Sequence, residues 1–247
     1  MRAIDDWQWA GVAAGLALFG VLAWDGIAQG PVYQADTVVN DWVGERAADG
    51  WPTRAVGEAL SLPADTYVAT PVVLTFAIIW WVWGERRIAT WAVVGGGGSA
   101  LLVVLLKTAF GRERPLFSDL APHSYSFPSG HTLSAAAALG ILIVMGTQVH
   151  VDRQRMKGDQ ARRAWRIALA CWIVLSFLVG SARVLAQRHW MSDVLASWCL
   201  GLALVCAVLR AAGVPRRRMP LPEPAPAPVE RAAEAVEHAT EAAGSKP

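Results

Sequence analysis

Charged residues are scarce in this chain, since only 17% of its 247 residues are Asp, Glu, Lys or Arg, against about a quarter in soluble domains. Hydrophobic residues make up 54% of the chain and gather in long apolar stretches. Cysteine is also rare, and the three cysteines lie inside those stretches without metal-ligand spacing: Cys171, Cys199 and Cys206. The composition argues against a soluble domain, and the cysteines are expected to be small buried hydrophobic residues.

Six of the apolar stretches are long enough to cross the hydrocarbon core of a membrane, which takes about 20 residues in a helix. They cover residues 7–24, 66–83, 88–106, 132–150, 166–186 and 192–213. The first could instead be a signal peptide, but Asp5 and Asp6 weaken its positive start and no clean cleavage site follows it. A retained helix is therefore favoured, and the sequence predicts six transmembrane helices.

Small residues mark two of these stretches. Residues 132–150 are rich in Ala and Gly and suit the interior of a bundle, where small side chains let helices approach closely. The third stretch contains the run Gly95 to Gly98, and each glycine weakens a helix by about 1 kcal/mol relative to alanine. Close helix packing is the favoured explanation of this run, and a local hinge is the alternative.

The charges between the stretches predict the orientation of the chain. Residues 151–166 carry six basic side chains, and residues 84–87 and 216–218 are basic as well. Residues 25–65, in contrast, carry seven acidic and only two basic side chains. The positive-inside rule then puts both termini and the basic loops in the cytoplasm. The remaining segments are expected outside: 25–65, 107–131 and 187–191.

Two segments outside the apolar stretches complete the expected fold. Residues 36–43 and 55–60 have the pattern of short amphipathic helices at the outer interface. Residues 220–247 pass from alternating prolines into an Ala/Glu-rich sequence that cannot bury a core. We therefore expect an all-α polytopic membrane protein, with a bundle of six transmembrane helices over residues 1–214 and a disordered cytoplasmic tail over 215–247.

Three short motifs at the predicted outer face contain cationic, histidine and carboxylate side chains. They are Lys107 with Arg114-Pro115, then Pro128-Ser129-Gly130-His131, then Arg183 with His189 and Asp193. The spans between them return the chain to the same side each time, so the motifs are expected to meet at one face. With one span more or fewer between them, His131 and His189 would lie on opposite sides. Charged side chains at the ends of membrane helices are costly, and they are usually functional.

The residue types of these motifs suit the binding of a phosphoryl group. Arg114 and Arg183 offer planar forks of donors that stay charged at any working pH, and with Lys107 they can clamp three oxygens. The start of the fourth span adds backbone N–H groups that favour an anion. Gly130 admits close contact there, and the Ser129 hydroxyl is one more donor.

Two histidines can divide the remaining chemistry. Asp193 lies four residues after His189, one helical turn along, where it would orient the ring and raise its basicity. His189 is therefore assigned as the nucleophile that forms a phosphohistidine. His131 is assigned as the acid that protonates the leaving oxygen and later activates water. The motifs contain no carboxylate cluster suited to a divalent metal, so catalysis without a metal or cofactor is expected.

The motifs resemble the signature of the type 2 phosphatidic acid phosphatase family, which also includes bacterial membrane lipid phosphatases and soluble vanadium haloperoxidases. The family pattern is Lys-x6-Arg-Pro, then Pro-Ser-Gly-His, then Ser-Arg-x5-His-x3-Asp. Every spacing is met, and the resemblance covers about residues 30–213. Ala182 departs from the pattern, since the third motif usually opens with serine and Ser181 stands one place earlier. The resemblance implies a six-helix bundle, an extracytoplasmic site, phosphohistidine chemistry at His189, and lipid phosphate or diphosphate substrates.

These features predict an integral-membrane lipid phosphatase of a plasma membrane, in particular a bacterial inner membrane, whose substrate reaches the site from the bilayer. The candidate substrates are undecaprenyl diphosphate, phosphatidic acid and phosphatidylglycerophosphate, and no nucleic-acid partner is expected. One alternative is a vanadate-dependent haloperoxidase that uses the same cations, although six spans argue against it. Another is a non-catalytic lipid-phosphate binder or transporter, which would not need two histidines and Asp193. Phosphotransfer to an acceptor other than water is a variant of the first hypothesis.

Overall fold

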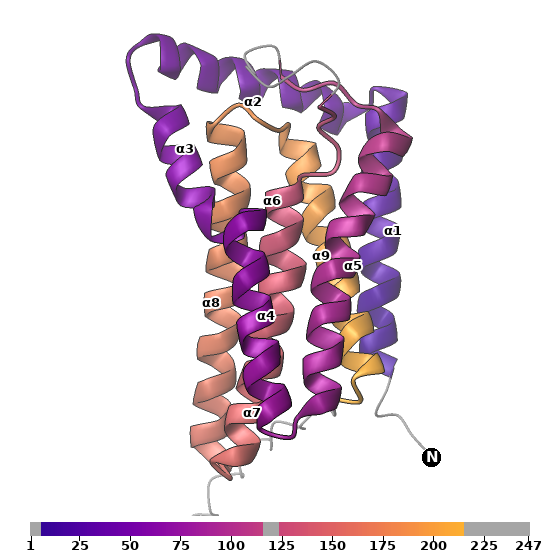
Figure 1. The fold of residues 1–247 in the computed structure, drawn as a ribbon. Coiled ribbons are helices and arrows are strands. Elements are labelled where there is room, and N and C mark those ends of the chain that lie inside the picture. The colour runs from indigo at the N-terminus through magenta and orange to yellow at the C-terminus, as the bar shows by residue number, and fades with distance from the viewer. Residues whose placement is uncertain (1–5, 116–123, 215–247) are drawn as a thin grey trace, which may run out of the picture. The chain divides into compact units, whose positions relative to one another are not determined.

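The computed structural model describes residues 6–115 and 124–214, and the expected tail over 215–247 lies outside the described residues. The described chain is helical, without a strand (Figure 1). In chain order its elements are α1 (Asp6–Ala28), α2 (Pro31–Ala48), α3 (Thr53–Ser61), the 3₁₀ turn η1 (Leu62–Ala64), α4 (Thr66–Val82), α5 (Arg86–Phe110), α6 (Gly130–Leu133), the π-helix η2 (Ser134–Leu139), α7 (Gly140–Arg153), α8 (Gly158–Leu185) and α9 (Met191–Ala211).

Six spans within the described residues are long and apolar enough to cross a membrane, which confirms the predicted number. Two of them consist of several elements. α3, η1 and α4 form the second span, and α6, η2 and α7 form the fourth. The long helices α1, α4, α5, α7, α8 and α9 lie side by side as one bundle (Figure 1). The chain is thus an all-α, multi-pass membrane protein.

The fourth span lies inside the bundle, as its small residues predicted, and it is the most buried of the six. Fully buried side chains follow one another along it: Leu133, Ala137, Ile141 and Met145. Its middle section is the π-helix η2, where Trp172 Nε1 of α8 donates a hydrogen bond of 2.9 Å to the Ala136 carbonyl oxygen. A side chain that takes a carbonyl from the helical ladder is a recognised cause of such a local distortion.

The glycine run 95–98 does not interrupt α5, which is one continuous helix. A Cβ atom at Gly95 would lie only 2.5 Å from Ile141 Cδ1 of α7, so this glycine permits the close packing that was predicted. Cβ atoms at Gly97 and Gly98 would meet nothing within 4 Å. Packing therefore explains only part of the run, and Gly97 borders a groove between α4 and α5.

The cysteine prediction is right for one residue and wrong for another. Cys206 is buried, Cys199 is partly buried, and Cys171 is exposed on α8. A Cβ atom at Gly11 of α1 would lie 2.5 Å from the Cys206 sulfur, so that thiol fills the contact between α1 and α9. The error at Cys171 has a physical reason, because an apolar side chain of a membrane helix faces lipid as readily as the protein interior.

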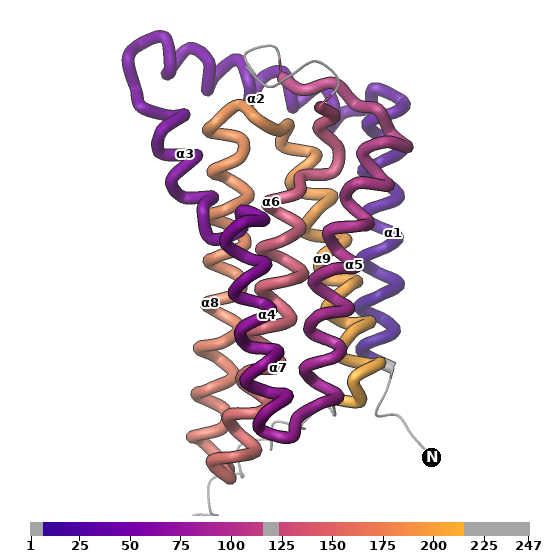
Figure 2. Tube along the Cα trace, viewed as in Figure 1, coloured from indigo at the N-terminus to yellow at the C-terminus, as the bar shows by residue number. Residues whose placement is uncertain are grey.

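The segment between the first two spans differs from the prediction of short interfacial helices. In place of a short helix over 36–43, α2 has 18 residues and lies across one end of the bundle (Figure 2). α3 begins near the expected 55–60 helix but packs along α8, where a Cβ atom at Gly57 would lie 2.5 Å from the Ala182 carbonyl oxygen. The amphipathic pattern understated the length of α2. It also gave no sign that a polar residue of this helix, Asp36, is buried.

The close contact between α9 and η2 can be tested with Gly201→Leu. A Cβ atom at Gly201 would lie 2.4 Å from Ala136 Cβ and 3.2 Å from the Ala136 carbonyl carbon. Since backbone atoms cannot turn aside, the variant should be destabilised by overpacking, which costs about 1–3 kcal/mol. Gly20→Leu in α1 is the matched control, because nothing lies within 4 Å of that Cβ position. Thermal unfolding in detergent measures both variants, and equal midpoints would contradict the packing.

Candidate active site

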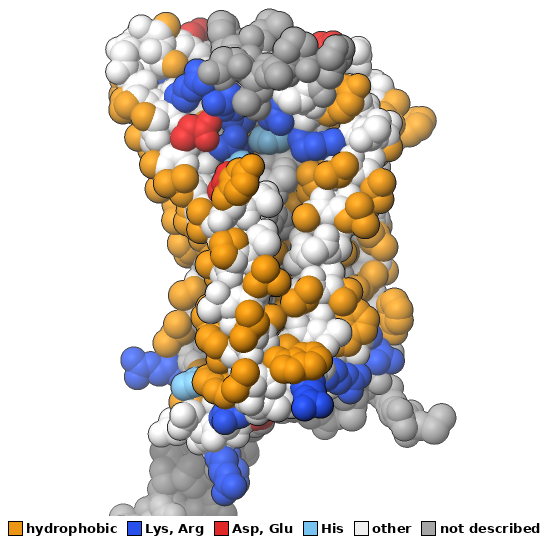
Figure 3. Space-filling model, viewed as in Figure 1, with side chains coloured by type: hydrophobic (Ala, Val, Ile, Leu, Met, Phe, Trp, Pro, Cys, Tyr) orange, Lys and Arg blue, Asp and Glu red, His pale blue; other side chains and the backbone are white. Residues whose placement is uncertain are grey.

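The three predicted motifs meet at the end of the bundle that α2 crosses, where Figure 3 shows histidine, basic and acidic side chains gathered above an apolar surface. Lys107 belongs to the last turn of α5, Arg114 follows that helix, Ser129 caps α6, Arg183 belongs to the last turn of α8, and His189 and Asp193 flank the start of α9. Segments far apart in the sequence therefore form one cluster.

His189 and Asp193 form a buried pair within this cluster. Nδ1 of His189 lies 3.3 Å from Oδ2 of Asp193, and this oxygen also accepts a hydrogen bond of 3.0 Å from the Trp190 backbone N–H. Nε2 of His189 lies 3.3 Å from Nη1 of Arg114. These partners assign the tautomer: Nδ1–H donates to the carboxylate, and Nε2 accepts from the guanidinium. The lone pair that could attack phosphorus thus faces a cation that could hold the phosphate.

The surroundings of His189 favour this neutral ring. Burial lowers the pKa of His189 well below its usual value, and neighbouring cations lower it further. These cations are, in order of their effect, Lys107, Arg114 and Arg183. Burial also lowers the pKa of Arg114, to about 10, although Asp193 opposes the change. Arg114 therefore stays charged at neutral pH while His189 is neutral, and this combination suits nucleophilic attack on an anionic phosphoryl group.

Lys107 and Arg114 are fixed by backbone oxygens. Lys107 Nζ donates to two carbonyl oxygens of the following segment, that of Ser126 at 3.3 Å and that of the residue before it. Arg114 Nε donates to the Ser124 carbonyl oxygen at 2.7 Å, and Nη1 donates to the Arg188 carbonyl oxygen. Neither cation forms an ion pair with a carboxylate in residues 6–115 and 124–214. Their positive charge is therefore available to an anion.

Arg183 has an acidic partner that sequence reasoning missed. Its Nη1 donates to Glu58 Oε2 at 2.9 Å and to Ser61 Oγ at 2.8 Å. Arg188 Nε donates to the other Glu58 oxygen at 2.7 Å. Nε of Arg183 is buried and has no hydrogen-bond partner among the described residues. A buried guanidinium N–H without a protein partner is what an anion-binding site offers.

The second motif forms the start of α6. Ser129 is the N-cap, and its hydroxyl accepts hydrogen bonds from the N–H of Thr132 at 3.5 Å and from its Oγ1 at 2.9 Å. The backbone N–H of Ser129 donates to Ser197 Oγ at 2.9 Å. Ser129 thus has the ordinary structural role of an N-cap, and its own hydroxyl proton can still be donated. Gly130 and His131 follow it and line the groove between α4 and α5.

Acids from the segment before α4 surround the cluster, and they are Asp36, Glu58 and Asp65. Asp65 Oδ2 lies 3.3 Å from Nε2 of His131. A further missed residue, Arg112, pairs with both Asp36 and Asp193. For the three acids the only signal in the sequence is the excess of acidic residues over 25–65, which was interpreted as evidence of topology.

Within the described residues no three His, Cys, Asp or Glu side chains gather as they would around a metal ion, and catalysis without a metal stays a prediction.

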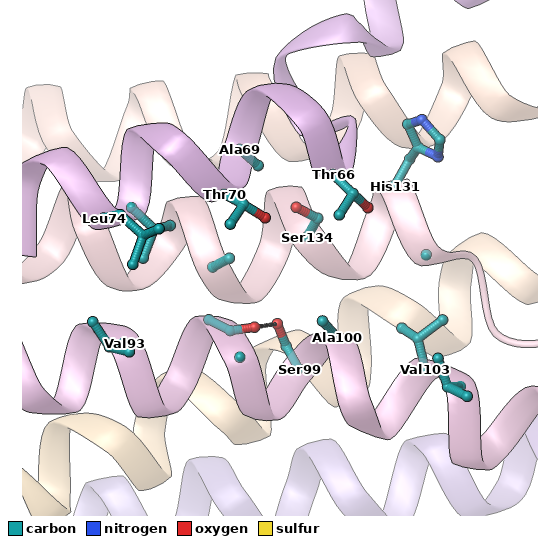
Figure 4. Close-up of a pocket in the computed structure, with 16 residues that line it drawn as sticks. Thr66, Ala69, Thr70, Leu74, Val93, Ser99, Ala100, Val103, His131 and Ser134 are labelled. Carbon is teal, nitrogen blue, oxygen red and sulfur yellow. Dashed lines mark hydrogen bonds between the residues drawn. The ribbon is translucent and has the colours of Figure 1, made fainter.

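A groove of about 360 Å³ between α4 and α5 ends at Gly130 and His131 (Figure 4). Its walls are small or apolar, and they include Ala69, Val73, Leu74, Val93, Gly97 and Ala100. The Ser99 hydroxyl in this wall is turned to the Gly96 carbonyl oxygen at 2.7 Å, so it presents little polarity to the groove. The groove therefore offers an apolar surface that leads along the spans to the second motif.

Comparison with known proteins identifies the family. Residues 88–217 match the model of the PAP2 superfamily. This match spans more than half of the chain and contains all three motifs, so the chain belongs to the PAP2 superfamily. The resemblance inferred from the motifs is thereby confirmed, although the match begins later than the expected residue 30. No curated protein matches the chain.

Solved structures show where the fold occurs. A transmembrane PAP2-type phosphatidylglycerolphosphate phosphatase from Bacillus subtilis aligns with a TM-score of 0.67 and 23% identity, over 84% of this chain and 98% of its own. LpxE from Aquifex aeolicus aligns with a TM-score of 0.49 and 19% identity, over 72% of this chain and 94% of its own. The six-span bundle is thus a PAP2 fold. The family and the fold together support a membrane hydrolase of lipid phosphate esters.

The neutral state of His189 can be measured directly by its NMR titration in the detergent-solubilised protein, with His189→Gln used to assign the signal. The ring should titrate below about 6.5, the ordinary value for histidine, because burial and nearby cations disfavour the imidazolium. Arg114→Gln removes one of these cations and should move the midpoint upward. A wild-type midpoint at or above the ordinary value would contradict the described electrostatics.

Proposed function

We propose that this chain is an integral-membrane lipid phosphatase that works through a phosphohistidine at His189. The observation that carries the proposal is the buried His189–Asp193 pair, in which the unprotonated nitrogen Nε2 lies 3.3 Å from Arg114 Nη1. A non-catalytic binder would need the cations but not a neutral, oriented imidazole among them. The proposed substrates are lipid phosphomonoesters or diphosphates, with undecaprenyl diphosphate, phosphatidic acid and phosphatidylglycerophosphate as the candidates.

In the first step the phosphoryl group binds between the cations Lys107, Arg114 and Arg183. Nε2 of His189 attacks phosphorus, and the bond from phosphorus to the leaving oxygen breaks. His131 gives a proton to that oxygen, which leaves as the lipid alcohol or, from a diphosphate, as the lipid monophosphate. Asp193 accepts the Nδ1–H bond throughout, which stabilises the positive charge that develops on the ring.

In the second step water replaces the lipid. His131, now neutral, takes a proton from water while the oxygen attacks phosphorus, and the bond from phosphorus to Nε2 breaks. Inorganic phosphate leaves, and both histidines return to their starting states. The cations lower the cost of the charge on the phosphoryl oxygens in both steps by binding them in a site with little water. No metal takes part in this scheme.

The lipid is proposed to reach the site sideways, with its chain in the groove between α4 and α5. The groove is lined mainly by apolar and small residues, with Thr66, Thr70 and Ser134 among them, and it ends beside His131. This order matches that of chain and phosphate in an amphiphile. The basic segments 84–87 and 151–166 lie at the opposite end of the bundle. The positive-inside rule then favours an extracytoplasmic site and cytoplasmic termini, in a bacterial inner membrane.

The proposal is tested by release of inorganic phosphate from the three candidate lipids in detergent with excess EDTA. Wild type should release phosphate, His189→Ala should not, and His131→Ala should be slower by about 10²–10⁴-fold, the usual value of general acid–base catalysis. His150→Ala is the control, because His150 is exposed on α7 at the other end. Release that survives His189→Ala would refute the phosphohistidine. Without any release, transport or vanadate-dependent halide oxidation becomes the function to assay.

The role of the groove is tested with Gly97→Phe against Gly98→Phe. Both positions have open space in the same helix, but only Gly97 lines the groove. Displacing even two methylene groups from apolar contact, at about 0.8 kcal/mol each, would lower kcat/KM for a long-chain lipid about tenfold. Gly98→Phe should leave it unchanged, and a short-chain, water-soluble phosphatidic acid should be hydrolysed equally by both variants. Equal effects of the two variants on the long-chain lipid would exclude the groove.

A further inference from the structure

Asp193 has an ion-pair partner, Arg112, that lies within the first motif but is not one of its specified residues. Its Oδ2 accepts hydrogen bonds from Nδ1–H of His189 and from the Trp190 backbone N–H. Its other oxygen, Oδ1, lies 2.8 Å from Nη1 of Arg112. Asp193 is fully buried, and a buried carboxylate is costly unless a charge and hydrogen bonds compensate it. Arg112 supplies that charge on the side of Asp193 that faces away from His189.

Arg112 is itself tightly held from both sides. Its Nη2 donates to Asp36 Oδ2 at 2.7 Å, and its Nη1 also donates to Ser192 Oγ at 2.6 Å. The guanidinium lies 5.3 Å from the ring centroid of Tyr33 and 5.6 Å from that of Trp190. The planar fork of arginine can make all these contacts at once, which a lysine could not. The side chain is therefore held in one orientation.

Asp36 links this arginine to α2 and to the start of α9. Its Oδ1 accepts from the Ser192 backbone N–H at 2.8 Å, and its Oδ2 accepts from the Ser192 hydroxyl. Only 1% of Asp36 is exposed. The chain Asp36–Arg112–Asp193 thus joins three segments by charged hydrogen bonds, and Asp36 lies outside the part of the sequence that matches the family.

We propose that Arg112 and Asp36 are positioning residues for His189. Arg112 fixes the Asp193 carboxylate at the distance and angle that hold the ring, and Asp36 fixes Arg112. Arg112 and Asp36 also influence the electrostatic potential at the His189 ring, because the Arg112 charge is shared between the carboxylates of Asp36 and Asp193. This inference rests on the proposed phosphohistidine chemistry, and neither residue touches the phosphoryl group. The competing explanation is that the network only fastens α2 to the end of the bundle.

The variants are chosen to separate charge from geometry. Arg112→Met removes the charge and keeps the length, Arg112→Lys keeps the charge but loses the fork, and Asp36→Asn removes the counter-charge. Arg46→Met and Asp49→Asn are matched controls on α2, because this pair is exposed, with side chains 43% and 64% accessible, and 3.9 Å apart. A displaced nucleophile costs up to about a hundredfold in rate, so kcat should fall at least tenfold in both Arg112 variants, with KM nearly unchanged.

The titration of His189 gives a second readout that does not depend on activity. The charged and titratable groups that face the ring, element by element, are Lys107 of α5, Arg114 after it, His131 of α6, Arg183 of α8 and Asp193 of α9. Removing the Arg112 charge leaves Asp193 less compensated, so the NMR midpoint of His189 should rise in Arg112→Met. Asp36→Asn leaves the arginine less compensated, so the midpoint should fall. The controls should move neither kcat nor the midpoint.

The outcomes separate this inference from the proposed function. If wild type releases no phosphate but the His189 midpoint moves in opposite directions in the two variants, the proposed function fails and the positioning network stands. If wild type is active and Arg112→Met lowers only thermal stability, with kcat and the midpoint unchanged, the network is a fastening and the inference fails. A rise in KM at unchanged kcat would also overturn it, because that result would put Arg112 in contact with the substrate.

Discussion

The site depends on holding four buried or partly buried cations close together at one end of an apolar bundle: Lys107, Arg112, Arg114 and Arg183. Such charges repel one another and lose hydration. Each therefore needs a partner whose favourable interaction offsets the free energy lost by desolvation. The chain solves this in two ways. Arg112 and Arg183 are paired with carboxylates, whereas Lys107 and Arg114 are held by uncharged acceptors, mainly carbonyl oxygens. Carbonyl dipoles fix a cation without neutralising it, so these two keep a charge that the proposed phosphate substrate would compensate.

The carboxylates that make this burial possible come largely from the segment between α1 and α4. Asp36, Glu58 and Asp65 reach Arg112, Arg183 and His131 from α2, from α3 and from the start of α4. The location of α2 across the end of the bundle follows from the same contacts, because its polar side faces charged groups of the protein in place of water. A helix that looks interfacial from its amphipathic pattern is thus partly a source of counter-ions.

The separation between motif cations and distant counter-ions explains what could and could not be predicted from the sequence. Hydropathy gave the number of spans, and motif spacing with span parity brought Lys107, His131 and His189 to one end, because both signals are local or periodic. The pairing of Asp36 with Arg112 has no such signal, since the two residues lie 76 positions apart and neither is a specified residue of a motif. The exposure of Cys171 was missed because hydropathy does not distinguish a lipid-facing position from a buried one. The π-helix at Ala136 was missed because it accompanies a single tertiary contact, the hydrogen bond from Trp172.

The two ends of a lipid substrate would be recognised by sequence features that are independent of each other. The phosphate would be bound by long charged side chains whose geometry is fixed by hydrogen bonds over many segments. The lipid chain would occupy a groove that is open because Gly97 has no side chain there. Two residues away, Gly95 lets α5 pack closely against Ile141 of α7. Under the proposed function, one glycine run would therefore serve both helix packing and substrate access. Because the groove involves no charged contact, its width can change through substitutions in α4 and α5 without disturbing the buried ion pairs on which the chemistry depends.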